Sequence, residues 1–235
     1  MEIIETGVPG LDKLLKGGIP VGNIVLVSGG PGTGKTTLAL QYLISGARKG
    51  ENVIYVTLSQ KPAETIKYGR KIFGNDLDLI EFMDFSPSSD VMSPYLTMEQ
   101  EDHADFGITR LKESISNKIA EKKYTRIVLD PINAFTNLFE SISHYRTKML
   151  DFFLFLKSTS LTSFLLYETQ ALEKESSIAE FLSDGIINLR LVEMGVRKGR
   201  AIEILKMRGI DHELTLTPFI IQEDGLKVQV GSPLF

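Results

Sequence analysis

Eight consecutive residues have the composition and spacing of a loop that binds phosphate. They read Gly29-Gly30-Pro31-Gly32-Thr33-Gly34-Lys35-Thr36 and match the pattern G-x-x-x-x-G-K-[ST] in full. The glycines allow successive N–H groups to point at phosphate oxygens, and a following helix adds unpaired donors and partial positive charge. We expect Lys35 to reach the β- and γ-phosphates of a nucleotide and the Thr36 hydroxyl to bind Mg²⁺. The alternative, a glycine-rich turn before a helix, gives no reason for Lys and Thr to follow the last glycine.

Two further residues complete the nucleotide and metal site that this loop predicts. Thr37 comes next in the helix and is included in the nucleotide-binding set, with packing or helix capping as its alternative role. Asp130 ends the stretch Arg126-Ile-Val-Leu-Asp130, the expected place for an acid that holds Mg²⁺. Because Pro131 follows it, Asp130 is also suited to cap a helix with proline at the first helical position. The two carboxylate oxygens allow both roles.

Short apolar runs rich in β-branched residues alternate with longer stretches that are compatible with helices. The runs predict strands at Ile24–Ser28, Val53–Leu58, Leu79–Met83, Ile127–Leu129 and Ser163–Tyr167. Helices are expected between them, at Lys35–Lys49, Ala63–Phe73, Ile108–Lys122 and Tyr145–Lys157. This alternation predicts a three-layer α/β fold whose central sheet is mainly parallel and covered on both faces. The phosphate loop would join the first of these strands to the first helix.

The pattern changes after Phe181. Strands separated by turn signals are expected at Gly185–Glu193, Arg200–Met207, Leu214–Ile221 and Gly225–Val230. They predict a C-terminal antiparallel extension at one edge of the sheet. The segment Phe85–Phe106 is polar and acidic and contains two prolines, so we predict a long loop there.

Composition excludes several classes of protein. The 235 residues carry a formal net charge of −4, which excludes a basic nucleic-acid-binding coat but not a local basic groove. The absence of cysteine excludes disulfides, zinc–thiolate sites and thiol catalysis. The sequence shows no secretory signal and no apolar run long enough to cross a membrane, so we expect a cytoplasmic protein without membrane contact. No repeat or linker divides the chain, and we expect one domain over residues 1–235.

The chain resembles the RecA superfamily, specifically its KaiC/RadA branch. The resemblance begins with Thr6-Gly7-Val8-Pro9-Gly10-Leu11-Asp12 and Gly17-Gly18-Ile19-Pro20, just before the phosphate loop. It continues in Ser183–Ile187, in the run from Glu203 through Lys206-Met-Arg208-Gly209 to His212, and in Pro218-Phe219-Ile220 with Asp224-Gly225-Leu226. A single-domain chain of this kind looks like an archaeal RadA paralog with a KaiC-like core. The resemblance implies a RecA-like, P-loop ATPase domain that uses ATP and Mg²⁺.

The resemblance also implies a nucleotide bound between adjacent copies in a homo-oligomer. In that arrangement Lys206 and Arg208 would reach the γ-phosphate of the neighbour's ATP, and His212 would approach the nucleotide. A cation supplied by a neighbour stabilises the charge on the transferring phosphoryl group. The alternative is that Lys206 and Arg208 are solvated charges, one pleat apart on one face of a strand.

One departure from the family pattern concerns hydrolysis. The resemblance places glutamate, often a pair, after the strand Val53–Leu58, where it activates water, but here Ser59-Gln60 follows. The general base is missing at that position. Gln60 can orient a water instead, as glutamine does in some GTPases, and Glu64 is a weaker candidate. We therefore predict a Mg²⁺-dependent ATPase with slow turnover. Glu168-Thr169-Gln170 would sense the γ-phosphate, or would simply be a polar exit from a strand.

Two functions from different classes follow. In the first, the protein binds single-stranded DNA and modulates homologous recombination or DNA repair, with a recombinase as a possible partner, without catalysing strand exchange. Its candidate DNA contacts are the segments Thr136–Arg146 and Gln170–Ser177 and two basic clusters. These clusters comprise Lys112, Lys118, Lys122, Lys123 and Arg126, and Arg197, Lys198 and Arg200. In the second, a KaiC-like regulatory module signals its ATP state through protein contacts. A small-molecule kinase is disfavoured, because no arginine-rich lid follows the nucleotide motifs.

Overall fold

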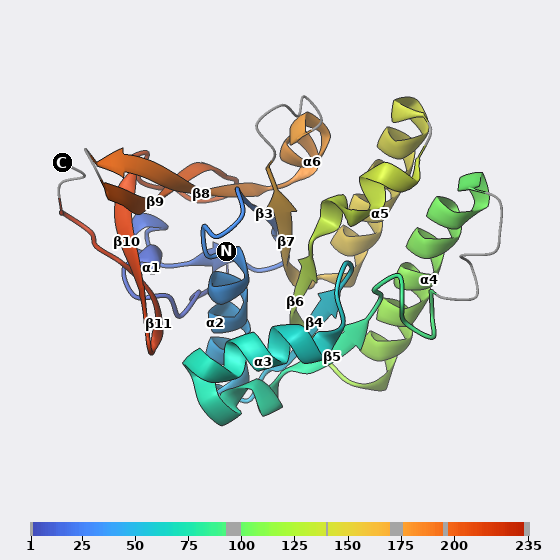
Figure 1. The fold of residues 1–235 in the computed structure, drawn as a ribbon, viewed down its shortest axis with the longest axis horizontal. Helices are drawn as coiled ribbons and strands as arrows, with labels where there is room; N and C mark the ends of the chain where they lie inside the picture. Colours follow the sequence, from blue (N-terminus) through green and yellow to red (C-terminus); the bar gives the residue numbers. More distant parts are fainter. Residues whose placement is uncertain (1, 93–99, 140, 170–175, 195–196, 233–235) are drawn as a thin grey trace.

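A nine-stranded sheet forms the centre of the molecule (Figure 1). This computed structural model describes residues 2–92, 100–139, 141–169, 176–194 and 197–232, and the structural statements below concern these residues. From one edge to the other, the parallel strands are β5 (Glu81–Asp84), β4 (Asn52–Thr57), β6 (Tyr124–Asp130), β7 (Thr162–Glu168), β3 (Ile24–Gly29) and β8 (Gly185–Met194). The antiparallel strands β9 (Arg197–Met207), β10 (Thr217–Gln222) and β11 (Gly225–Val228) extend the sheet beyond β8.

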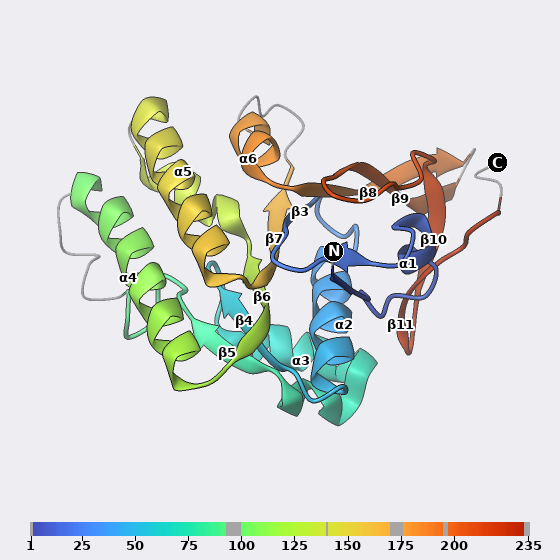
Figure 2. The same cartoon turned by 180° about the vertical axis from the view of Figure 1, so that it is seen from behind.

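Helices cover both faces of the sheet (Figures 1 and 2). One face carries α1 (Leu11–Leu14), α2 (Lys35–Ala47), α3 (Pro62–Phe73) and the 3₁₀ segment η1 (Gly74–Leu79). The other face carries α4 (Gln100–Glu121), α5 (Ile142–Thr159) and α6 (Ser176–Leu182), with the 3₁₀ segment η3 (Ile132–Leu138) between β6 and α5. A separate pair of short strands, β1 (Ile3–Ile4) and β2 (Ile19–Pro20), precedes the phosphate loop.

Alternate side chains of each central strand fill two different cores. In β3, Val25 and Val27 pack with α2, whereas Ile24 and Leu26 pack with α5 and its neighbours, and all four are fully buried. Full burial of such a side chain is worth about 1.5–3 kcal/mol. This two-sided burial explains why the strands are continuously apolar in sequence, and it fixes the strand ends from which the functional residues emerge.

The observed elements confirm the predicted three-layer α/β fold and its antiparallel extension. One segment was predicted wrongly: Phe85–Phe106 is not a loop throughout, because α4 already begins at Gln100. Residues 93–99 lie outside the described residues. Leu79 was also misassigned, since it closes η1 and the strand begins at Glu81. No candidate membrane span is found among the helices described here.

Arg126 is a charged residue inside the core. Its side chain is 1% exposed, and two of its nitrogens each lie 2.7 Å from a carboxylate oxygen of Glu51. A third nitrogen donates to the backbone oxygens of Glu5 and Tyr42, both at 3.0 Å. The guanidinium also occupies the space where a Cβ on Gly46 would stand, 2.4 Å from Arg126 Nε. Arg126 therefore does not belong to the basic surface that the sequence suggested.

Candidate functional site

The phosphate-loop sequence forms the connection between β3 and α2, as predicted. Its last glycine, Gly34, caps the helix with a positive φ of 106°, a conformation that favours glycine. A Cβ there would also lie 2.8 Å from Ile221 Cδ1 of β10. Gly34 thus lets the antiparallel extension approach the start of α2. Thr33, in contrast, is buried and donates its hydroxyl to the Gly30 carbonyl at 2.8 Å, so it shapes the loop from within.

Lys35 holds its ammonium group against the loop. Lys35 Nζ donates to the backbone oxygens of Gly29 at 2.8 Å and Gly30 at 3.0 Å. Burial lowers the pKa of Lys35, while the negative charges of Glu168 and Asp130 act in the opposite direction. An ammonium has three donors, so one remains for an anionic ligand beside the two that hold the side chain in place.

Thr36 and Asp130 meet in space although 94 residues separate them in sequence. The Thr36 hydroxyl donates to Asp130 Oδ2 at 3.3 Å, and the buried Tyr55 hydroxyl donates to the same oxygen. Burial raises the pKa of Asp130, and the hydrogen bonds from Tyr55 and Thr36 partly offset this effect. The capping role predicted for Asp130 is wrong, because Pro131 occupies the cap position and η3 begins at Ile132.

A hydroxyl beside a carboxylate suits Mg²⁺, which prefers oxygen ligands and keeps several waters. The described residues contain no group of three or more His, Cys, Asp or Glu that could hold a metal ion. Thr36 and Asp130 therefore fit a metal ion that arrives with phosphate oxygens and water as its remaining ligands.

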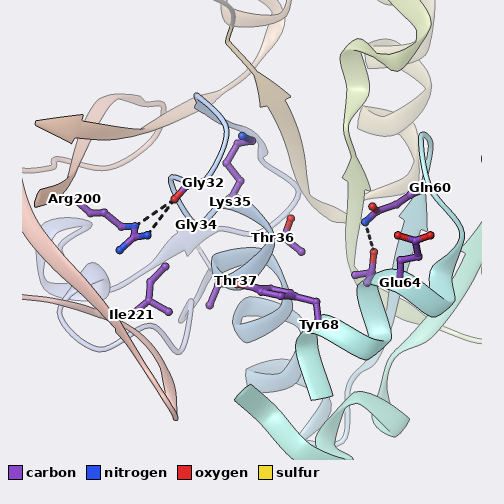
Figure 3. Close-up of a pocket in the computed structure, with 11 residues that line it drawn as sticks. Gly32, Gly34, Lys35, Thr36, Thr37, Gln60, Glu64, Tyr68, Arg200 and Ile221 are labelled. Atoms are coloured by element: carbon purple, nitrogen blue, oxygen red, sulfur yellow. Dashed lines mark hydrogen bonds between the residues drawn. The ribbon is translucent and has the colours of Figure 1, made fainter. Parts of the chain in front are cut away.

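Lys35 and Thr36 line a pocket of about 520 Å³ beside the phosphate loop (Figure 3). Of the predicted site residues, it brings together Gly32, Gly34, Lys35, Thr36, Thr37 and Gln60. The weaker candidate Glu64 also lines it. Thr65, Tyr68 and Ile221 also line the pocket and were not predicted, and Arg200, predicted only as part of a basic cluster for DNA contact, lines it as well. The four-residue spacing from Glu64 to Tyr68 places both on one face of α3, a signal that could have identified Tyr68.

The newly found residues connect the pocket walls to the loop. The hydroxyl groups of Tyr68 and Thr37 are 2.6 Å apart and share a hydrogen bond, which joins α3 to the start of α2. Two nitrogens of Arg200 donate to the Gly32 carbonyl, each at 3.3 Å. Arg200 thus ties the antiparallel extension to the phosphate loop and places a positive charge on the wall of the pocket.

Gln60 follows β4 and has a fixed orientation. Its Nε2 donates to the Thr65 hydroxyl at 2.9 Å (Figure 3). This bond leaves the Gln60 carbonyl oxygen, an acceptor, available to a water in the pocket. The exposed residue Glu64 lies on the same wall, in the first turn of α3.

Lys206, Arg208 and His212 do not line this pocket. Val25 of β3 pairs with Gly185 of β8, which pairs with Met207 of β9. Arg208, the next residue, therefore lies near the start of β3, whereas Gly29 is at the other end of that strand. Arg208 is at the level of Ile24, which is five residues from Gly29 along β3, or about 17 Å at the usual rise. The alternative of solvated charges does not hold for Lys206, whose ammonium is bonded within the protein, whereas Arg208 follows the end of β9 with a side chain that is 56% exposed.

Both cations have partners at that far end of the sheet. Lys206 donates to the backbone oxygen of Glu180 at 2.7 Å, and burial lowers its pKa, with the charge of Arg208 acting in the same direction. Arg208 lies 3.6 Å from the carboxylate of Asp184. His212 is half-buried, and its Nδ1 atom has no hydrogen-bond partner among the described residues.

The residues proposed to contact DNA are largely engaged within the protein. Tyr145 is buried, and Phe139 packs against it and against His144, whose Nε2 lies 3.0 Å from Asp105. Ion pairs also occupy much of the first basic cluster. They join Lys112 to Asp151, Lys118 to Glu81 and Glu121, and Lys122 to Glu81. Residues 170–175 and 195–196 lie outside the described residues, as does the side chain of Arg197.

Comparisons with known proteins identify close relatives. The family described as "ATPase: KaiC" matches residues 4–232. A UPF0273 protein of Thermotoga maritima is 32% identical over 96% of this chain and 95% of its own length. The circadian clock oscillator protein KaiC of a Nostoc species is 33% identical over 97% of this chain, which spans only 44% of that protein. The solved structure of the KaiC-like protein PH0186 from Pyrococcus horikoshii has a TM-score of 0.81 and 28% identity, covering 97% of this chain and 99% of PH0186.

Proposed function

The chain belongs to the KaiC family of ATPases, and on that premise we propose that it binds ATP with Mg²⁺ in the described pocket and hydrolyses it slowly. The observation that carries this proposal is the meeting of the Thr36 hydroxyl and the Asp130 carboxylate beside the Lys35 loop. Residues 1–235 would act as one KaiC-like domain whose ATP state is communicated through protein contacts.

Each side chain has a defined part in this proposal. Lys35 and the N–H groups of Gly32 and Gly34 would hold the β- and γ-phosphates, while Thr36 and Asp130 would hold Mg²⁺ directly or through water. When bound, Mg²⁺ neutralises charge that develops on the phosphates. Tyr68, Ile221 and Arg200 form the outer wall, where the rest of the nucleotide would lie.

Calorimetry tests the proposal directly. Injection of Mg²⁺-ADP into the purified protein should release or absorb heat that fits one site per chain. The same titration with inorganic phosphate should give a much weaker signal, because it lacks the contacts of the nucleoside. Absence of any heat with Mg²⁺-ADP and Mg²⁺-ATP at several temperatures would overturn the assignment of this pocket.

Hydrolysis without a glutamate after β4 should depend on Gln60. Replacing Gln60 with alanine should lower the turnover rate, because the acceptor that orients water is lost. Replacing it with glutamate should raise turnover by about 10²-fold, the lower end of what a positioned base contributes. Steady-state phosphate release measures both changes. Glu64→Gln is the matched control: if it lowers turnover and Gln60→Ala does not, Glu64 and not Gln60 acts on the water.

We further propose that Lys206 and Arg208 act on the nucleotide of a neighbouring copy. Arg208 lies at the opposite end of the sheet from its own Gly29, so it cannot serve its own phosphate loop. A head-to-tail assembly would bring this end of one copy against the pocket of the next. His212 would then approach the same nucleotide from Arg208's side.

Mixing two inactive variants tests this arrangement. Arg208→Ala should lower turnover by about 10³-fold or more, the usual effect of losing such a cation, and Lys35→Ala should be inactive through its own pocket. A mixture should regain activity, because an Arg208→Ala chain keeps its pocket and receives Arg208 from a Lys35→Ala neighbour. Roughly a quarter of head-to-tail interfaces in an equal mixture have this pairing. If subunit exchange is demonstrated and activity is not regained, the role in trans is wrong.

Single-stranded DNA binding, a role in recombination or repair, and identity as a RadA paralog stay predictions. The ion pairs and packed aromatic residues described above reduce the surface available for such contacts. Fluorescence anisotropy with a labelled oligonucleotide separates this function from signalling through protein contacts. Affinity that falls steeply as salt rises would support DNA binding. No binding at low salt, with and without ATP, would exclude it.

A further inference from the structure

A buried tyrosine lies directly beneath the proposed metal site. Tyr55 is on β4, is fully buried, and packs its ring against Phe82 of the neighbouring strand at 5.4 Å between centroids. In the sheet register Tyr55 lies opposite Val128, and Thr57 lies opposite Asp130. The Tyr55 side chain therefore extends along the sheet by two residue positions, toward the level of Asp130, and its hydroxyl donates to Asp130 Oδ2.

This hydrogen bond acts on the same oxygen that Thr36 uses. A buried tyrosine hydroxyl needs a partner, and here the partner is the one carboxylate that the metal proposal requires. With Thr36 and Tyr55 both donating to Oδ2, the carboxylate plane is fixed from two sides. Among the described residues, none donates a hydrogen bond to Oδ1 of Asp130, so it is the oxygen free to face a metal-bound water. Tyr55 adds this constraint without adding a charge.

We infer that Tyr55 is a positioning residue that orients Asp130 toward Mg²⁺. The inference rests on the proposed function, because it assigns a role toward the metal that accompanies the nucleotide. Partners that orient metal ligands commonly change metal affinity by about 10- to 100-fold when they are removed. Loss of the Tyr55 hydroxyl alone should have an effect of that size on the Mg²⁺ requirement, while the phosphate loop stays intact.

The experiment measures how ADP affinity depends on Mg²⁺ concentration. Calorimetric ADP titrations are performed in EDTA and across a range of Mg²⁺ concentrations for the wild type and Tyr55→Phe. The variant should need about 10-fold or more Mg²⁺ for the same gain in ADP affinity. Its ADP affinity in EDTA should equal that of the wild type, because Lys35 and the loop amides are unchanged. Tyr55→Met, which also lacks the hydroxyl, gives the same comparison if Tyr55→Phe does not fold.

Tyr42→Phe is the matched control. Tyr42 is also fully buried, stacks on Phe164 at 4.0 Å, and donates its hydroxyl to the Thr162 backbone oxygen at 3.1 Å, away from the metal site. It should lose one buried hydrogen bond without changing the Mg²⁺ requirement. Equal Mg²⁺ dependence in Tyr55→Phe and wild type would overturn the inference, as would the same loss in Tyr42→Phe.

A double variant separates action through Asp130 from a remote effect. In an Asp130→Asn background, adding Tyr55→Phe should produce no further change in the Mg²⁺ requirement, since the carboxylate on which Tyr55 acts is gone. A further loss of similar size would overturn the role assigned to Tyr55. If the wild type itself binds ADP without any dependence on Mg²⁺, the metal part of the proposed function fails, and that result is distinct from a failure confined to Tyr55.

Discussion

Replacing Lys35 with alanine should weaken the binding of Mg²⁺-ATP by roughly 30-fold to a few thousand-fold. Truncating one partner of a hydrogen-bonded charge pair costs about 2–5 kcal/mol, which corresponds to that range. Lys35 is held at the loop by the carbonyls of Gly29 and Gly30, so its ammonium is already in place when the phosphates arrive. Calorimetric titration of the variant with Mg²⁺-ATP measures the loss.

The control for this prediction is Lys227→Ala. Lys227 is a partly exposed lysine of β11 that pairs with Asp224 in the turn between β10 and β11, and it does not line the pocket. Its removal changes the net charge by the same amount as Lys35→Ala and should leave nucleotide affinity unchanged. Equal affinities for Lys35→Ala and wild type would refute the assignment of the phosphate loop as the binding site.

Replacing Glu51 with glutamine should lower the free energy of unfolding at neutral pH by about 3 kcal/mol. Removing one partner of a buried ion pair typically costs about 3–5 kcal/mol, because the other charge stays buried without compensation. The lower value applies because the Glu51 side chain is 20% exposed, whereas that of Arg126 is only 1% exposed. Urea denaturation followed by circular dichroism suits this measurement, since the chain contains no tryptophan.

The same pair predicts a pH dependence with a definite sign. The hydrogen bonds from Arg126 lower the pKa of Glu51 in the folded protein. A carboxyl group whose folded pKa is depressed stabilises the protein above its unfolded pKa, about 4.3, and this contribution is lost as pH falls through the folded value. The Glu51→Gln variant should therefore lose less stability than the wild type on acidification below about pH 4.3.

An exposed ion pair provides the comparison for Glu51. Glu113 pairs with Arg110 at 3.0 Å on the surface of α4, and both side chains are about half exposed. Glu113→Gln should change the unfolding free energy by less than about 1 kcal/mol. If Glu51→Gln is equally mild, the buried pair does not contribute as inferred.

The fold could be predicted from sequence because burial leaves a periodic signature. Strands such as Ile24–Gly29 are apolar on both faces, and the phosphate-loop pattern marks the first crossover. The start of α4 could not be predicted in the same way. The first part of α4, from Gln100 onward, is polar and acidic, so its sequence resembles that of a solvated loop.

The site was only partly predictable, and the reason is physical. Residues that belong to a local motif, such as Lys35 and Thr36, carry their signal in consecutive positions. Tyr68 and Arg200 reach the pocket only through the packing of α3 and β9 against the loop, which no local pattern encodes. The same holds for Tyr55. In the sequence it is one residue of a largely apolar strand, and only the pairing of β4 with β6 brings its hydroxyl to Asp130.

The buried Arg126 also determines which segments of the chain unfold together. Its guanidinium joins the carbonyls of Glu5 and Tyr42 to the carboxylate of Glu51. None of the three segments can detach alone without leaving a dehydrated cation short of partners. The amino-terminal segment, helix α2 and the start of β4 should therefore open as a single cooperative unit, and their amide protons should exchange with solvent at a common free energy.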